Sequence, residues 1–195
     1  MKTERRLLIA DEAIVILAEE GLHGLTHRAV DRRLKLPGGS TSYYFRTRQA
    51  LIGAAVDRLL EIDDADLDQL VGVLEEMIAT ARAGDPPVAA DGELLASLFE
   101  LWAAPERQQR LAARFELLLS AVRVDGDRRI LAARQHFVDR TKELLLRIGV
   151  AAPEDDARAI VAMFDGLSFD ALIDADGAEA RHRVAVRLQR ALDRR

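Results

Sequence analysis

Apolar residues recur every three or four positions along most of the chain, which is the spacing of one buried face of an α-helix. The stretch 3–20 shows the pattern well, with Leu8, Ile9, Ala13, Ile16 and Leu17 on one face. Runs that alternate apolar and polar residues are scarce, and no Asn-Gly or Asp-Gly pair joins two β-branched stretches. The sequence therefore predicts an all-α fold of roughly nine helices.

Capping and breaking residues predict where these helices begin and end. Gly21 is a suitable left-handed stop for the first helix, and Thr26 and Thr47 are good N-caps. The loop Gly84-Asp85-Pro86-Pro87 is the strongest break in the chain. The expected helices that matter below are 3–20, 26–34, 39–45, 47–82, 153–174 and 178–193.

The charge is distributed unevenly along the chain. Residues 1–50 hold nine Lys/Arg and six Asp/Glu (net +3), and residues 51–195 hold the remaining 19 and 27 (net −8), which sum to −5. Within 26–48 there are six basic residues and a single acid, Asp31. A basic head on an acidic body suits contact with a polyanion, although charge alone fits chance clustering on a solvated surface equally well.

The composition indicates a folded protein of a reducing compartment. The chain is 49% hydrophobic and 31% charged, and it contains no cysteine. The first residues are charged and amphipathic, unlike a signal peptide, and no apolar run approaches the roughly 18 residues that a membrane helix needs. We expect a cytoplasmic protein.

The segments 26–34 and 39–45, joined by Lys35-Leu36-Pro37-Gly38, fit a helix-turn-helix packed on helix 3–20. In that motif the second helix enters the DNA major groove. Tyr43 and Tyr44 lie about 100° apart on a helix, so at least one should face solvent or phosphate, whereas Phe45 should fill the small core. The residues expected to contact DNA are Thr26, His27, Arg28, Gly38, Gly39, Ser40, Thr41, Tyr43, Tyr44, Arg46 and Arg48, with the two last arginines clamping the backbone.

Residues 5–55 resemble the N-terminal domain of TetR-family transcriptional repressors. The resemblance rests on the first-helix ladder, on Thr26 and Val30, on Leu36 after the turn, and on a signature that follows it without a gap. The matching positions are Ile9, Ala13, Ile16, Leu17 and Gly21 in the ladder, and Gly39 to Ser42, Phe45, Thr47 to Gln49 and Leu51 in the signature. The chain departs from the family pattern at Asp31, Leu34 and Lys35, where the family usually has Ala-x-x-Ala-Gly, and at Ser42, where it usually has Tyr.

The resemblance implies a DNA-binding domain over 1–50 and an effector-binding and dimerisation domain over 51–195. It implies a ligand-responsive regulator, expected to be a repressor, that binds a palindromic operator as a homodimer and is released by a small molecule. Residues that could line the ligand pocket, or equally be plain core, are Met77, Phe99, Trp102, Phe115, Phe137 and Met163. The last two helices carry apolar stripes that could pack on their own domain or, as the resemblance implies, on a twin; the expected dimer residues are Ile160, Phe164, Leu167, Ala171, Val184, Leu188 and Ala191.

Other arrangements of polar residues have weaker support. Asp64, Asp66, Asp68 and Glu75 have calcium-loop spacing, but the required glycine is Gln69, so an acidic helix face is favoured. His136 and Asp139 are more typical of a helix surface than of a metal site. No phosphate loop or nucleophile elbow is present. We expect no metal, no cofactor and no catalytic site; the alternative to a regulator is an all-α ligand-binding or scaffold protein without DNA binding, and an enzyme is the weakest option.

Overall fold

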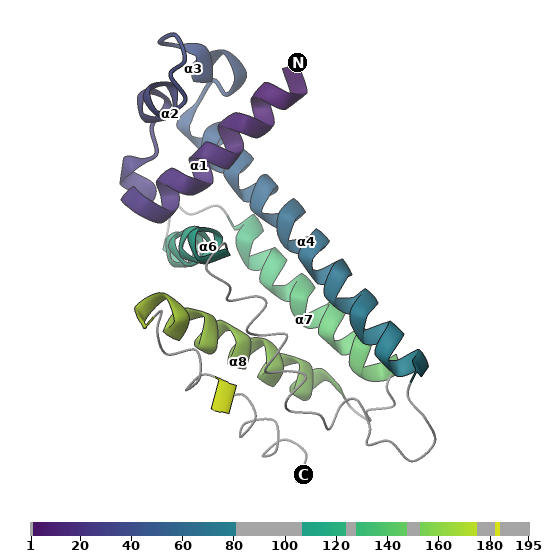
Figure 1. The fold of residues 1–195 in the computed structure, drawn as a ribbon. Coiled ribbons are helices and arrows are strands. Elements are labelled where there is room, and N and C mark those ends of the chain that lie inside the picture. Colours follow the sequence, from purple (N-terminus) through teal and green to yellow (C-terminus); the bar gives the residue numbers. More distant parts are fainter. Residues whose placement is uncertain (1, 81–106, 124–127, 148–152, 175–181, 184–195) are drawn as a thin grey trace. The chain divides into compact units, whose positions relative to one another are not determined.

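The computed structural model describes residues 2–80, 107–123, 128–147, 153–174 and 182–183, and these hold helices and no strand (Figure 1). The expectation of an all-α fold is confirmed for this part of the chain. Seven helices lie in it, whereas the sequence predicts roughly nine overall. Nearly all of the predicted helix 178–193 lies outside the described residues. The helices are α1 (Lys2–Gly24), α2 (His27–Arg33), α3 (Ser40–Tyr44), α4 (Arg48–Thr80), α6 (Gln108–Ala121), α7 (Arg129–Arg147) and α8 (Pro153–Ile173).

Two threonines start helices as the sequence predicts. The Thr26 hydroxyl accepts a hydrogen bond from the Ala29 amide at 3.1 Å, and the Thr47 hydroxyl accepts one from the Ala50 amide at 3.0 Å. Each bond satisfies an amide that has no partner within its own helix. Both N-cap predictions are therefore confirmed, for α2 and for α4.

The first helix is interrupted at Gly21 and then continues for a short turn to Gly24. Gly21 has φ +68° and ψ −173°, a backbone region that only glycine adopts without strain. The interruption leaves the Leu22 amide without an intrahelical acceptor, and it donates to the Glu116 carboxylate of α6 at 2.8 Å. Gly21 thus ends the regular helix, as predicted, but the chain remains helical for three residues beyond it.

The chain divides into two compact units, and the first comprises residues 1–64 and 109–133. Its core joins α1, α2 and the first half of α4 to α6 and the start of α7. The largest fully buried side chains here are Ile9, Ile16, Leu17, Leu25, Val30, Leu51, Val56, Leu59, Leu111, Leu117 and Ile130. The prediction that Leu8 shares the buried face of α1 is wrong, because this side chain is exposed.

The second unit comprises residues 65–108 and 134–195. Among its described residues, Val138 and Leu145 of α7 pack against Ala157 and Val161 of α8, with Phe137 and Ile160 at the edge of this cluster. The predicted boundary at residue 50 divides the chain by function, whereas these units divide it by compactness. The functional boundary therefore stays a prediction.

Acidic side chains of α4 form ion pairs with arginines of later helices. Three of these pairs join residues that are 72 positions apart, so α4 and α7 run in the same direction. They are Asp57–Arg129 in the first unit, and Asp68–Arg140 and Glu75–Arg147 in the second. Asp66 pairs with Arg107 at 3.3 Å. Two of the four carboxylates considered for a calcium loop therefore contact arginines from α7, and a third contacts one next to α6.

Candidate nucleic-acid interface

The turn between α2 and α3 is a Schellman motif. The Leu36 amide donates to the Asp31 carbonyl at 2.8 Å, and the Lys35 amide donates to the Arg32 carbonyl at 3.2 Å. This geometry needs a left-handed residue at position 35, and Lys35 has φ +52°. Lys35 thus adopts a strained left-handed conformation at a position where the family that residues 5–55 resemble usually has glycine.

A buried carboxylate on α2 fixes the start of α3. Asp31 is only 5% exposed, and its two oxygens accept the Gly39 amide at 2.8 Å, the Thr41 amide at 2.8 Å and the Thr41 hydroxyl at 2.6 Å. Gly39 itself has φ +88° and begins α3 without a side-chain cap of its own. Asp31 therefore caps α3 from the preceding helix.

The environment of Asp31 favours its ionised form. Burial raises the pKa of Asp31, but hydrogen bonds from the Thr41 hydroxyl and from the Thr41 and Gly39 amides, together with the charge of His27, outweigh it. The net pKa lies below the ordinary value. The only acid in the basic stretch 26–48 is thus a structural carboxylate that holds two helices together.

The two hydroxyls expected to face DNA at the start of α3 are used inside the protein. Thr41 is fully buried and donates to Asp31, which differs from the exposed donor that the sequence suggested. The Ser40 hydroxyl donates to the Pro37 carbonyl at 2.5 Å. Gly38, Gly39 and Ser42 are exposed, and Ser42 is a surface position that sequence reasoning did not select.

Arg33 ties α2 to α1 and is not part of the free basic surface. Its guanidinium contacts Glu12 at 2.5 Å, Glu19 at 2.7 Å and Glu20 at 3.3 Å. The hydrogen bonds that Arg33 donates to Glu19 and, next in size of effect, to Glu12 raise the pKa of Arg33 above its ordinary value. The exposed cations of this region are Arg28, Arg32, Lys35, Arg46 and Arg48.

The consecutive aromatic residues divide between surface and core. Tyr43 is 71% exposed, Tyr44 is half-buried, and their rings meet edge to face at 5.1 Å. Phe45 is buried, as predicted, with the Arg6 guanidinium 4.4 Å from its ring centroid. His27 Nε2 donates to the Phe45 carbonyl at 2.6 Å, so this histidine links the start of α2 to the end of α3.

The two arginines expected to clamp the DNA backbone lie in different environments. Arg48 Nε donates to the Leu25 carbonyl at 3.2 Å, and its Nη2 donates to the Leu22 carbonyl. These bonds attach the start of α4 to the end of α1 and engage the guanidinium that was expected to face DNA. Arg46 is exposed and has no described hydrogen bond or ion pair within residues 2–80.

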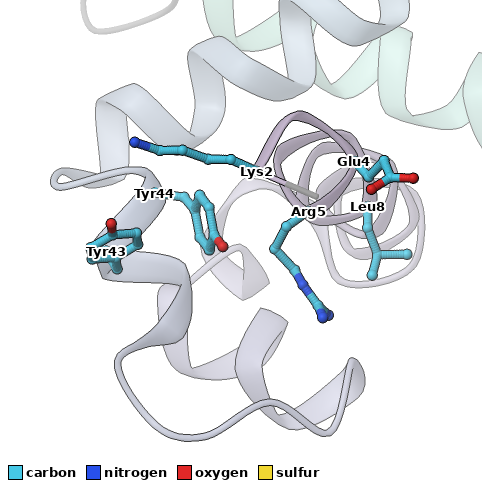
Figure 2. A pocket seen from close by; sticks show the side chains of 6 residues that line it. All are labelled: Lys2, Glu4, Arg5, Leu8, Tyr43 and Tyr44. Carbon is cyan, nitrogen blue, oxygen red and sulfur yellow. The ribbon is translucent and has the colours of Figure 1, made fainter.

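A groove beside α3 brings in residues that the sequence analysis missed (Figure 2). Lys2, Glu4, Arg5 and Leu8 of α1 line it together with Tyr43 and Tyr44, and its volume is about 520 Å³. The Lys2 ammonium lies 5.9 Å from the centroid of the Tyr43 ring. The i, i+3 spacing of Lys2 and Arg5 places both on one helix face, but only the fold shows that this face meets α3.

The expected ligand and dimer residues lie in both units. Phe115 is half-buried on α6 in the first unit, and Phe137 and Met163 are half-buried on α7 and α8 in the second. On α8, Ile160 and Phe164 are half-buried, whereas Leu167 and Ala171 are buried within the single chain. The Met77 side chain and the residues Phe99, Trp102, Val184, Leu188 and Ala191 lie outside what the structure describes. The ligand-binding role of the first group and the dimer role of the second stay predictions.

Two α8 side chains absent from those predictions are exposed: Phe169 is 50% exposed and Ile173 is 71% exposed.

Within the described residues, no helix combines the length and apolar character that crossing a membrane requires. No group of three or more His, Cys, Asp or Glu in the same part of the chain could hold a metal ion.

The chain is similar to solved structures of a TetR-family member and of a multidrug binding protein. One is a member of the TetR family from Streptomyces coelicolor, which is 28% identical with a TM-score of 0.69, over 95% of this chain and 98% of that one. Another is the multidrug binding protein EbrR complexed with ethidium, 28% identical with a TM-score of 0.62 over 95% and 98% of the two chains. EbrR complexed with malachite green is 25% identical with a TM-score of 0.65 over the same shares.

A comparison with curated proteins gives no match. A sequence model of one family, described as "Tetracyclin repressor-like, C-terminal domain", matches residues 86–194, which is more than half of the chain. This match covers the part of the sequence that the N-terminal resemblance does not reach. Together with the similarity to solved regulators, it shows that the chain belongs to the TetR family of transcriptional regulators.

Proposed function

We propose that this protein is a homodimeric transcriptional repressor that binds a palindromic DNA operator and is released by a small-molecule effector. In this proposal α1, α2 and α3 form a three-helix DNA-binding unit with a helix-turn-helix, and α3 lies in the major groove. Residues 1–50 are the DNA-binding domain, and 51–195 form the effector-binding and dimerisation domain.

The proposal rests on one observation: α3 is held rigidly, and the exposed arginines of the same region have no described carboxylate partner. The Schellman turn and the Asp31 cap fix α3 from two directions. Arg28, Arg32 and Arg46 are exposed, and the structure describes no carboxylate partner for them in residues 2–80. Acids are the usual partners of surface arginines, so a cluster of cations without them is suited to phosphates.

The contacts within this surface change the roles of some predicted residues. Thr41 and His27 support α3 from inside, and Arg48 supports the start of α4. The Ser40 hydroxyl is likewise bonded within the protein. The contacts to DNA are then made by Arg28, Gly38, Gly39, Tyr43, Tyr44 and Arg46, and by Ser42 in addition. Thr26 keeps its role as the cap that sets the angle of α2.

Dimerisation would use the exposed apolar side chains of α8. Phe169 and Ile173 lie one turn apart on the face of α8 opposite to Ile160 and Phe164, and a stable interface on this face would bury upwards of about 1,200 Å² in total. A two-fold axis would hold two α3 helices about 34–36 Å apart, which matches one turn of DNA. This spacing is what a palindromic operator requires.

Release by an effector follows from linkage. A ligand that prefers a different spacing of the two α3 helices lowers DNA affinity by its differential binding, typically about 1–3 kcal/mol. Helix α4 contributes residues to both compact units and is the natural lever. EbrR, a similar protein, is named a multidrug binding protein and is complexed with ethidium and malachite green, which favours an aromatic effector for this chain.

The proposal is tested by a gel-shift titration with the DNA that flanks the protein's own gene, repeated with increasing concentrations of malachite green, with dye binding to the protein also measured without DNA. We expect a discrete complex that salt weakens and that the dye dissociates. Dye binding without any DNA complex would favour the alternative, an all-α ligand-binding protein without DNA binding.

A further inference from the structure

The groove between the first turn of α1 and the end of α3 has a chemical composition that is unusual for this surface (Figure 2). Two cations, Lys2 and Arg5, and two phenolic side chains, Tyr43 and Tyr44, line it. Figure 2 shows Lys2 extending toward the tyrosines. Glu4 and Leu8 also line the groove, so Lys2, Arg5 and Glu4 together give its lining a net charge of +1. The groove therefore presents donors and positive charge on the side that faces α3.

We propose that this groove binds a backbone phosphate of duplex DNA, with Lys2 and Arg5 supplying charge and the Tyr43 and Tyr44 hydroxyls donating hydrogen bonds. The inference rests on the proposed function and extends its DNA contact from the helix-turn-helix to α1. The structure describes no carboxylate partner for Lys2 or Arg5 within residues 2–80. Their charges are thus available to an external anion.

The length of α3 places this groove near a phosphate. Tyr44 lies four residues after Ser40, about 6 Å along the helix axis. The major groove is about 12 Å wide, so a short helix that lies across it has its ends close to the flanking backbones. Lys2 and Arg5 project from α1 at the C-terminal end of α3, where such a backbone would pass.

The arrangement of the tyrosines supports a polar ligand. Tyr43 is the most exposed large side chain of α3, and the edge-to-face contact with Tyr44 fixes its ring. The Lys2 ammonium lies above the same ring, within cation–π distance. The ring therefore orients the lysine. The hydroxyls remain available, because the described contacts of the two tyrosines involve only their rings and the Tyr44 backbone carbonyl.

The test compares the full-length wild-type protein with Lys2→Gln/Arg5→Gln. The probe is a duplex selected by the wild-type protein from a random-sequence pool, and its Kd is measured between about 50 and 200 mM salt. The matched control is Arg123→Gln/Arg128→Gln, which removes two exposed charges of the same compact unit that do not line the groove. All four positions are exposed, so thermal melting should be unchanged in both variants.

We expect the groove variant to lose about one unit of salt slope per protomer, with the order of preference among duplexes unchanged. We also expect Tyr44→Phe to weaken binding several-fold without changing the slope, because the hydroxyl carries no charge. A groove variant whose slope and affinity equal those of the control would overturn the inference and leave the proposed function intact. A wild-type protein that selects no duplex would instead overturn the proposed function itself, and the inference with it.

Discussion

The Asp31 carboxylate on α2 accepts both the amide and the hydroxyl of Thr41 on α3, at 2.8 and 2.6 Å. A third bond comes from the Gly39 amide at 2.8 Å. One buried side chain thus sets the position of the helix that is proposed to enter the major groove. The stability of this helix and its capacity to bind DNA should therefore depend on the same residue.

Asp31→Ala should lower the free energy of unfolding by about 2–4 kcal/mol, because it leaves two amides and a buried hydroxyl without their acceptor. Urea denaturation measures the change. The control is Glu143→Ala, an exposed position on α7 that should change stability by about 0.5 kcal/mol or less. Equal stability of the two variants would show that Asp31 does not cap α3.

Lowering the pH should weaken the same cap. The pKa of Asp31 in the folded protein lies below its ordinary value of 3.8, so ionised Asp31 stabilises the folded state. This stabilising contribution is complete when the pH is above the ordinary pKa of Asp31. It is lost as the pH falls through the ordinary pKa toward the lower pKa of the folded protein. Below about pH 5 the unfolding free energy of the wild type should therefore fall more steeply than that of Asp31→Asn, which does not titrate. Parallel curves for the two proteins would contradict a lowered pKa.

Gly21→Ala should destabilise the protein by about 1–3 kcal/mol, because alanine is strained at a glycine-only conformation. The new Cβ would be in ordinary contact, at 3.4 Å, with the Glu116 carboxylate that accepts the Leu22 amide, so the backbone strain causes the loss. Calorimetry should show a lower Tm. Gly72→Ala is the matched control: a Cβ there meets nothing within 4 Å, and the helical position should gain about 0.5–1 kcal/mol. A Gly21→Ala protein as stable as the wild type would show that the interruption of α1 is not required.

Ile173→Asp should convert the proposed dimer to monomers, because it places a charge in the exposed apolar pair that Ile173 forms with Phe169 on α8. Sedimentation equilibrium measures the association. Leu146→Asp on α7 is the control, since Leu146 is also more than half exposed but lies on another helix of the same unit. If the wild type is a dimer and neither substitution dissociates it, the dimer forms through a different surface.

Much of the first unit follows from the sequence, because its signals are local. A threonine three residues before the amide it caps is visible in a short window, and both such caps are present. The exposure of one tyrosine follows from helical geometry, since the adjacent Tyr43 and Tyr44 cannot share one face. Phe45, which follows α3 in an extended conformation, is buried as predicted.

The features that sequence reasoning missed depend on tertiary contacts. Asp31 reads as the one acid in a basic stretch, and its partners lie eight and ten residues further along the chain. The sequence predicts that Arg48 binds a DNA phosphate, but its guanidinium donates hydrogen bonds to carbonyls more than twenty residues earlier in the chain. Periodicity alone places Leu8 in the core, although at this end of α1 it borders the open groove beside α3. Spacing along the chain gives no information about which elements will meet.

The most direct test of sequence-specific DNA binding is an equilibrium titration of the protein with two duplexes. One is the selected duplex, and the other is a scrambled duplex of equal length and composition. The account predicts that the selected duplex binds at least about 1,000-fold more tightly at physiological salt. It also predicts that Arg46→Gln weakens binding to both duplexes by a similar factor, since a phosphate contact carries no sequence information. Equal affinity of the wild-type protein for the two duplexes would contradict the account.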